Sequence, residues 1–368
     1  MKKFLLLFAL CGLFSFQAKA EGEVTDKITI SELQKDAKGN YFFIVSLDGS
    51  EFYYEGYQLD LEFPEGVDVQ TSNNKLRITK CSDSPIYLDE WEEPTSHTIS
   101  CTFGTIGGER NLRVACVDMN GASFGATSGD LFKVYVVKSS PYVNPETIIK
   151  TSTLWFTYNR GNNTNYLPED TYTIQLDNSS EISLNISATQ QWNTCVLPFD
   201  AELPEGVRAF EGSSISGDYL ILSEATSLQA FTPYILYAEN GYEGTLSGTV
   251  DAEKYVTAAT GAYLNGAIMP QGITEGYVMQ DKGQGDGMMF YNVNNRSFTI
   301  PSGKCWVSAA AGDAKAIRIG LGGTGIESLP SASQTEEGEV YTLDGKRVQN
   351  PQKGNVYIKG GKKVLYLK

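Results

Sequence analysis

The sequence contains very little histidine, no long apolar run after its first residues, and no helical periodicity. His97 is the single histidine in 368 residues, and no two cysteines form a C-x-x-C pair. We therefore expect no Cys/His zinc site. Beyond residue 20 no stretch approaches the roughly twenty apolar residues that a transmembrane helix needs. We expect no transmembrane segment in the mature chain, and no cofactor.

Positive charge is also scarce. The chain has 29 Lys and Arg against 44 Asp and Glu, a formal net charge of −15. Nucleic acid is therefore not an expected partner. Residues 339–368 differ from the rest, with seven basic and two acidic residues. A basic segment on an acidic body is typical of a separately recognised module, although a solvated strand face has the same composition.

Five cysteines follow residue 20, and this odd number leaves at least one of them unpaired. We expect at most one or two disulfides and leave their pairing open. The five are Cys81, Cys101, Cys116, Cys195 and Cys305.

The patterns that are present have a period of two residues, which predicts an all-β protein. Seven short runs within residues 21–141 predict a β-sandwich of seven to nine strands. These runs are Ile28–Leu33, Tyr41–Leu47, Tyr57–Phe63, Lys75–Thr79, Thr98–Phe103, Asn111–Val117 and Leu131–Val137.

Further short runs between residues 172 and 322 predict a second all-β domain. Residues 142–171 are rich in Pro, Asn and Thr, and we interpret them as a connector with one strand near 152–158. Residues 323–338 are polar and predict a linker. Three short runs within residues 339–368 predict a small C-terminal β tail, with a tight turn at Asp344-Gly345.

The first twenty residues have the pattern of a cleaved signal peptide. Lys2 and Lys3 precede an apolar segment, and Ala18-Lys19-Ala20 provides a small-residue cleavage site at Ala18 and Ala20. The expected location is the periplasm, the outer-membrane surface or the medium. Cys11 would be the acylated residue of a lipoprotein, but Leu10 is bulky where a small residue is needed.

Two glycine-rich motifs have the residue spacing of known sites but lack the secondary structure that those sites need around them. Ser123 lies in a G-x-S-x-G motif, but no helix is expected to follow it, and His97 precedes the serine. We interpret that segment as a loop and His97 as a surface or strand-edge residue. Residues 320–325 match G-x-G-x-x-G, but Pro330 follows too soon for the helix that phosphate binding requires.

Acidic and aromatic clusters offer weaker signals. Residues 89–93, and Asp281 with Asp286, are candidate calcium ligands, but neither run matches an EF-hand loop. A solvated loop is the interpretation that we prefer for both. The aromatic groups at 53–57 and 155–158 could form platforms for sugars or proteins. Tyrosines in β-sandwiches are more often half-buried strand residues, and we favour that interpretation.

The tail resembles the C-terminal sorting domains of the type IX (Por) secretion family. The matching residues are Val340-Tyr341, Leu343-Asp344-Gly345, Arg347-Val348, Lys353-Gly354, Val356-Tyr357-Ile358 and Lys368. The resemblance implies recognition by export and sorting machinery. Gly345, Gly354, Tyr357 and Lys368 are the tail residues that it singles out.

Two other segments carry a resemblance. Residues 46–69 and 111–140 are similar to a cohesin-like β-sandwich, which implies a fold more than a ligand. Residues 192–199, 231–236 and 300–306 resemble a "WnTxxLPF" β module of exported proteins, with no activity that we can carry over.

These features predict a non-enzymatic exported or cell-surface protein with a binding or adhesion module. Its ligand would be an unknown extracellular protein or glycan. One alternative is a structural component of a surface assembly. The other is a carbohydrate-active enzyme or its accessory protein, because any two of the 44 acids could meet at the separation that glycoside hydrolysis needs. No catalytic residue is singled out.

Overall fold

A computed structural model describes most of the chain. The described residues are 26–49, 52–283, 287–308, 314–321, 340–342, 346–348, 356–359 and 362–365. Their regular structure is β-strand, apart from one 3-10 turn at Ala252–Lys254. The prediction of an all-β protein is confirmed. No helix in this part of the chain is long and apolar enough to cross a membrane.

The chain divides into two compact units. The first comprises residues within 1–63, 69–137 and 148–173, and the second comprises those within 64–68, 138–147 and 174–368. The predicted signal peptide, with Ala18 and Ala20, and the predicted linker at 323–338 lie outside the described residues.

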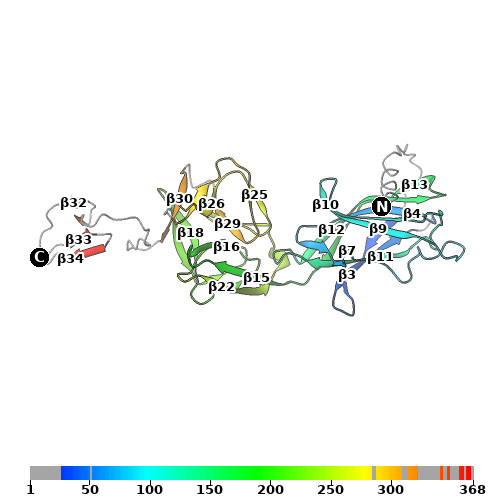
Figure 1. Cartoon of the computed structure of the whole chain (residues 1–368), viewed down its shortest axis with the longest axis horizontal. Helices are drawn as coiled ribbons and strands as arrows, with labels where there is room; N and C mark the ends of the chain where they lie inside the picture. Colours follow the sequence, from blue (N-terminus) through cyan, green and yellow to red (C-terminus); the bar gives the residue numbers. More distant parts are fainter. Residues whose placement is uncertain are drawn as a thin grey trace. The chain divides into compact units, whose positions relative to one another are not determined.

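Two six-stranded sheets form the first unit (Figure 1). One sheet has the order β1 (Lys27–Ile30), β3 (Tyr41–Asp48), β11 (Gly129–Lys138), β5 (Val67–Val69), with β2 (Gln34–Lys35) beside β3 and β8 (Ile78–Lys80) beside β11. The other has the order β13 (Asn163–Tyr166), β12 (Glu146–Tyr158), β4 (Gly56–Glu62), β10 (Glu109–Val117), β9 (Thr98–Ile106), with β14 (Thr171–Gln175) beside β12. A small hairpin joins β6 (Thr71–Ser72) to β7 (Lys75–Leu76).

The side chains between these two sheets make the unit a β-sandwich. Tyr57 of β4 stacks against Phe132 of β11 with ring centroids 6.0 Å apart, and Phe43 of β3 lies 6.3 Å from Phe63. All four are buried. Buried and partly exposed residues alternate along most of β3. This alternation explains the period-two pattern in the sequence of that strand.

Residues 142–171 do not form a separate connector, because 142–147 belong to the second unit and 148–171 to the first, whereas the predicted strand near 152–158 is the second half of β12. Strand β12 is thirteen residues long and pairs with β4, while β13 pairs with β12. A bulge between Ser152 and Trp155, with Thr153 at φ 51°, shifts the register. The buried residues before the bulge are therefore out of phase with those after it, and this hid the period-two pattern over the strand's full length.

A ten-stranded sheet dominates the second unit. Its order is β16 (Trp192–Cys195), β21 (Tyr234–Tyr237), β18 (Arg208–Ser216), β19 (Tyr219–Ala225), β30 (Ala316–Leu321), β27 (Met288–Asn292), β26 (Tyr277–Asp281), β29 (Lys304–Val307), β24 (Leu264–Ala267), β23 (Ala258–Thr260). Strands β19 and β30 pair in parallel and the other neighbours are antiparallel. Three two-stranded sheets accompany it: β15 (Ser179–Ile186) with β22 (Tyr242–Thr249), β17 (Ala201–Glu202) with β20 (Ser227–Leu228), and β25 (Gln271–Ile273) with β28 (Phe298–Ile300).

The large sheet curls so that its first strand, β16, comes close enough to β29 to form hydrogen bonds with it. The Val196 amide donates to the Gly303 carbonyl at 3.2 Å, and the Cys305 amide donates to Thr194 Oγ1 at 3.0 Å. Buried side chains from most strands of the sheet, among them Phe210, Tyr277 and Phe290, fill the interior. A second apolar cluster packs beneath β15 and β22. The approach of β16 to β29 positions the cavity described below.

The described tail residues form a small sheet of their own. Its order is β32 (Arg347–Val348), β31 (Val340–Tyr341), β33 (Val356–Lys359), β34 (Lys362–Leu365). The sequence predicted three of these four strands. The predicted turn at Asp344-Gly345 lies outside the described residues.

Candidate functional site

The loop between β8 and β9 presents large apolar side chains to solvent. Trp91 is 72% exposed, Leu88 44% and Tyr87 42%. We call residues 81–97 the Trp91 loop. Met119, 75% exposed, lies in the loop after β10. Asp118 of that loop accepts a hydrogen bond from the Ser96 amide at 2.6 Å, so the two loops are joined.

Asp89 fixes the conformation of the Trp91 loop. Its Oδ1 accepts hydrogen bonds from the backbone amides of Trp91 and Glu93, both at 2.9 Å. The Asp89 amide in turn donates to the Glu93 carbonyl at 2.8 Å. Glu92 takes the left-handed conformation, with φ 63°, that this tight turn requires. Trp91 is therefore held on an ordered turn.

His97 anchors the base of the same loop. Nδ1 lies 2.9 Å from Thr95 Oγ1 and Nε2 lies 3.0 Å from the Glu55 carbonyl oxygen. The ring also packs edge-on against Phe124 at 5.0 Å. Burial lowers the pKa of His97. The expectation of a surface or strand-edge histidine was wrong, since His97 is only 2% exposed and is part of the core below the loop.

The electrostatic character of the Trp91 loop is acidic. Glu90, Glu92 and Glu93 are exposed beside Trp91 in the sequence, and Asp89 is partly exposed. The described part of the chain contains no group of three His, Cys, Asp or Glu side chains that could hold a metal ion. Asp89 Oδ1 instead receives backbone amides. The loop therefore combines an exposed aromatic ring with several free carboxylates.

The other candidate sites from the sequence do not assemble among the residues that the structure describes. Ser123 is buried, and neither ring nitrogen of His97 is bonded to it or to a carboxylate. Asp281 Oδ1 accepts the Gly283 amide at 2.8 Å, whereas Asp286 lies outside the described residues. Gly320, the first residue of the G-x-G-x-x-G motif, lies inside β30, whereas residues 322–325 lie outside the described residues.

The aromatic groups at 53–57 and 155–158 are largely core. Tyr54, Tyr57 and Phe156 are fully buried, whereas Tyr53 is 44% exposed. The interpretation of these residues as strand packing fits, and they form no continuous platform. Sequence reasoning missed Trp91, the most exposed aromatic side chain among the described residues. The sequence could have indicated the exposure of Trp91, because acids flank this tryptophan on both sides and could not all be buried in a core.

All five described cysteines are free thiols. Burial raises the pKa of Cys81 to about 11 and of Cys116 to about 12, so these thiols stay protonated at neutral pH. Among the tail residues singled out above, Tyr357 lies in β33. Gly345, Gly354 and Lys368 lie outside the described residues.

Comparison with known proteins assigns no family to the chain. No protein-family model and no curated protein matches it. Among solved structures it is similar to a type I cohesin–dockerin complex of Clostridium thermocellum, with 12% identity and a TM-score of 0.29 over 43% of this chain and 99% of that chain. A 35 kDa C-terminal fragment of the major pilin GBS80 of Streptococcus agalactiae has 12% identity and a TM-score of 0.28, over 82% and 99%. Domains D2 and D3 of the major pilin SpaD of Corynebacterium diphtheriae have 11% identity and a TM-score of 0.24, over 74% and 89%.

Proposed function

We propose that this chain is a non-enzymatic exported protein whose first unit binds an extracellular protein through the Trp91 loop. The observation that carries the proposal is the 72% exposure of Trp91 on a turn that Asp89 fixes. A large aromatic side chain on an ordered loop loses little conformational entropy on binding. Tryptophan is also among the residues that contribute most to protein interfaces.

The charge around Trp91 favours a basic partner. Three exposed acids, Glu90, Glu92 and Glu93, neighbour Trp91 in the loop. A Lys or Arg side chain of the partner could pair with one of these carboxylates while its cation lies over the indole. Charge complementarity of this kind accelerates association and selects partners. A neutral glycan would use the indole by stacking but would leave the carboxylates without a role.

Capture from the cell envelope of the source organism tests the binding proposal. The bait is the full mature chain, compared with Trp91→Ala and with Tyr166→Ala, a matched control because Tyr166 is a 58% exposed aromatic residue on β13 of the same unit. We expect Trp91→Ala and high salt to abolish retention of one identified protein with a basic surface, and Tyr166→Ala to leave retention unchanged.

Other outcomes would replace the proposal. Retention only of further copies of this chain would indicate a structural component of a surface assembly. Trp91-dependent binding to a glycan array without a protein partner would indicate a sugar-binding module, and turnover of a polysaccharide would indicate an enzyme.

The two ends of the sequence support export as part of the same proposal. The signal-peptide pattern would direct the chain across the inner membrane, and the tail would direct it onward to the surface. Deletion of residues 339–368 should leave the two units folded and remove surface exposure, measured by protease accessibility on intact cells. Unchanged exposure of the truncated chain would eliminate sorting by the tail while leaving the binding proposal untouched.

A further inference from the structure

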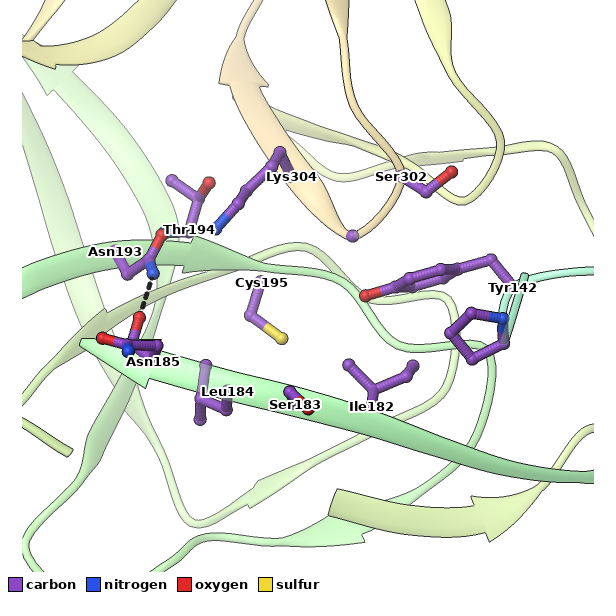
Figure 2. A pocket seen from close by; sticks show the side chains of 12 residues that line it. Tyr142, Ile182, Ser183, Leu184, Asn185, Asn193, Thr194, Cys195, Ser302 and Lys304 are labelled. Atoms are coloured by element: carbon purple, nitrogen blue, oxygen red, sulfur yellow. Dashed lines mark hydrogen bonds between the residues drawn. The ribbon is translucent and has the colours of Figure 1, made fainter. Parts of the chain in front are cut away.

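The second unit contains a cavity of about 310 Å³ beside the site where β16 approaches β29. Side chains from β15, β16, the segment at Tyr142 and the turn before β29 line it (Figure 2). Its polar lining includes Tyr142, Asn193 and Lys304, and the buried side chains of Ile182 and Leu184 add an apolar wall. A volume of this order lies at the small end of the range for ligand pockets.

The charge of the lining is unusual for this acidic chain. Lys304 is its single ionisable basic residue, and no Asp or Glu contributes to it. The Lys304 ammonium donates to the neutral Asn193 Oδ1 at 2.8 Å. Within the described residues it has no carboxylate at ion-pair distance. The chain has 44 acidic residues against 29 basic ones, so most of its cations could find a carboxylate partner. A partly buried ammonium without one is costly and therefore stands out.

Burial of Lys304 carries an energetic cost that a ligand could remove. Desolvation lowers the pKa of Lys304, and the groups that oppose this shift are the thiols of Cys195 and Cys305, which are neutral at pH 7 because burial raises their own pKa. A negatively charged group in the cavity would compensate the ammonium. The cavity therefore favours an anion over a neutral or cationic ligand.

Tyr142 supplies a positioned hydroxyl on the opposite side. Figure 2 shows this hydroxyl pointing toward Cys195. The Tyr142 carbonyl accepts a hydrogen bond from the Tyr255 hydroxyl at 2.8 Å, which holds the residue in place. Its own hydroxyl makes no hydrogen bond to any described residue. The side chain passes so close to Gly303 that a Cβ there would lie 2.0 Å from the hydroxyl oxygen.

We propose that this cavity binds a small hydroxylated carboxylate of the uronic acid class. Lys304 would pair with the carboxylate, and the Tyr142 hydroxyl would bond to a hydroxyl group of the ligand. The site lies wholly within the second unit and is independent of the Trp91 loop, so either site can fail without the other.

Titration of the full mature chain with D-glucuronate tests the site, with D-glucose and acetate as matched probes. We expect saturable glucuronate binding by calorimetry that weakens with salt, weaker binding of acetate, and none of glucose. Lys304→Met should weaken glucuronate binding about ten- to a hundredfold, because it removes a hydrogen-bonded charge pair. Tyr142→Phe should weaken it about two- to tenfold. Lys315→Met, an exposed lysine of the same unit, should have no effect.

A variant could also lose binding because it misfolds. A measurement on the unmodified chain distinguishes this effect from loss of the Lys304 contact. Glucuronate should shift the Lys304 side-chain NMR signals in wild-type protein and leave those of Lys315 in place. No saturable glucuronate binding, or equal binding by Lys304→Met, would overturn the proposal. Equal affinity for acetate would overturn recognition of the hydroxyl groups, and binding of glucose would overturn recognition of the charge.

Discussion

Arg113 of β10 lies directly opposite Asp60 of β4 and donates two hydrogen bonds of 2.7 Å to its carboxylate. The Asp60 side chain is 3% exposed and that of Arg113 is 36% exposed. The pair therefore joins two inner strands of the sandwich through a carboxylate that water cannot reach. Asp60 lies on the opposite face of β4 from its neighbours Leu59 and Leu61, and Arg113 makes its burial tolerable.

Replacement of Arg113 by Met should destabilise the first unit by about 3 kcal/mol at pH 7, because it leaves the Asp60 carboxylate buried without a partner. Urea unfolding followed in that unit measures the loss. Arg208→Met is the matched control, since Arg208 also forms a bidentate pair with Glu224, but both side chains are about half exposed. Its cost should stay below about 1 kcal/mol. Equal costs for the two variants would contradict the role of burial.

The single histidine should make the stability of the first unit depend on pH. The folded state lowers the pKa of His97 from its ordinary 6.5, so below pH 6.5 the unfolded chain binds a proton that the folded chain resists. Stability is therefore full above 6.5 and falls as the pH drops below it, with a slope of at most about 1.4 kcal/mol per pH unit. Thermal melting between pH 7.5 and 5.5 should show this fall in the wild type and a flatter profile in His97→Gln. If the melting temperatures of the wild type and His97→Gln fell in parallel, the pH dependence of stability would come from other groups.

The sequence was informative wherever one face of a strand is buried. Strands such as β3 and β10 alternate over most of their length, and their predicted ranges agree with the structure. It was less informative where the backbone departs from that repeat, as at the bulge in β12. Strands β18 and β22 were missed because glycine and serine are frequent in both and dilute the apolar signal.

Neither candidate site could be assembled from the sequence. In the sequence Trp91 is one residue of an acidic run. The sequence alone does not show that Asp89 folds the loop back through hydrogen bonds and leaves the indole exposed to solvent. The cavity depends on Lys304, which lies more than a hundred positions along the chain from both Tyr142 and Asn193. The curl of the large sheet brings Asn193 of β16 beside Lys304 of β29.

Gly303 should tolerate no side chain. Its φ of +78° is unfavourable for other residues, and an alanine Cβ would lie 2.0 Å from the Tyr142 hydroxyl. Gly303→Ala should therefore destabilise the second unit by about 2–4 kcal/mol, from backbone strain and overpacking together. A double-mutant cycle with Tyr142→Ala separates the two causes, because removing the ring relieves the clash but leaves the strain. Additive costs would show that the two residues do not compete for space.

Asp89 should matter for binding through the order that it imposes on the Trp91 loop. Asp89→Ala removes the acceptor for the Trp91 and Glu93 amides, so those amides should exchange hydrogen faster while global stability changes by less than about 1 kcal/mol. The loop must then be ordered during association, which should lower the affinity for the Trp91-dependent partner. Glu90→Ala is the matched control: it removes the same charge from an exposed neighbour. If both variants weaken binding equally and neither changes amide exchange, the carboxylate acts through its charge, and the loop needs no fixed conformation to present Trp91.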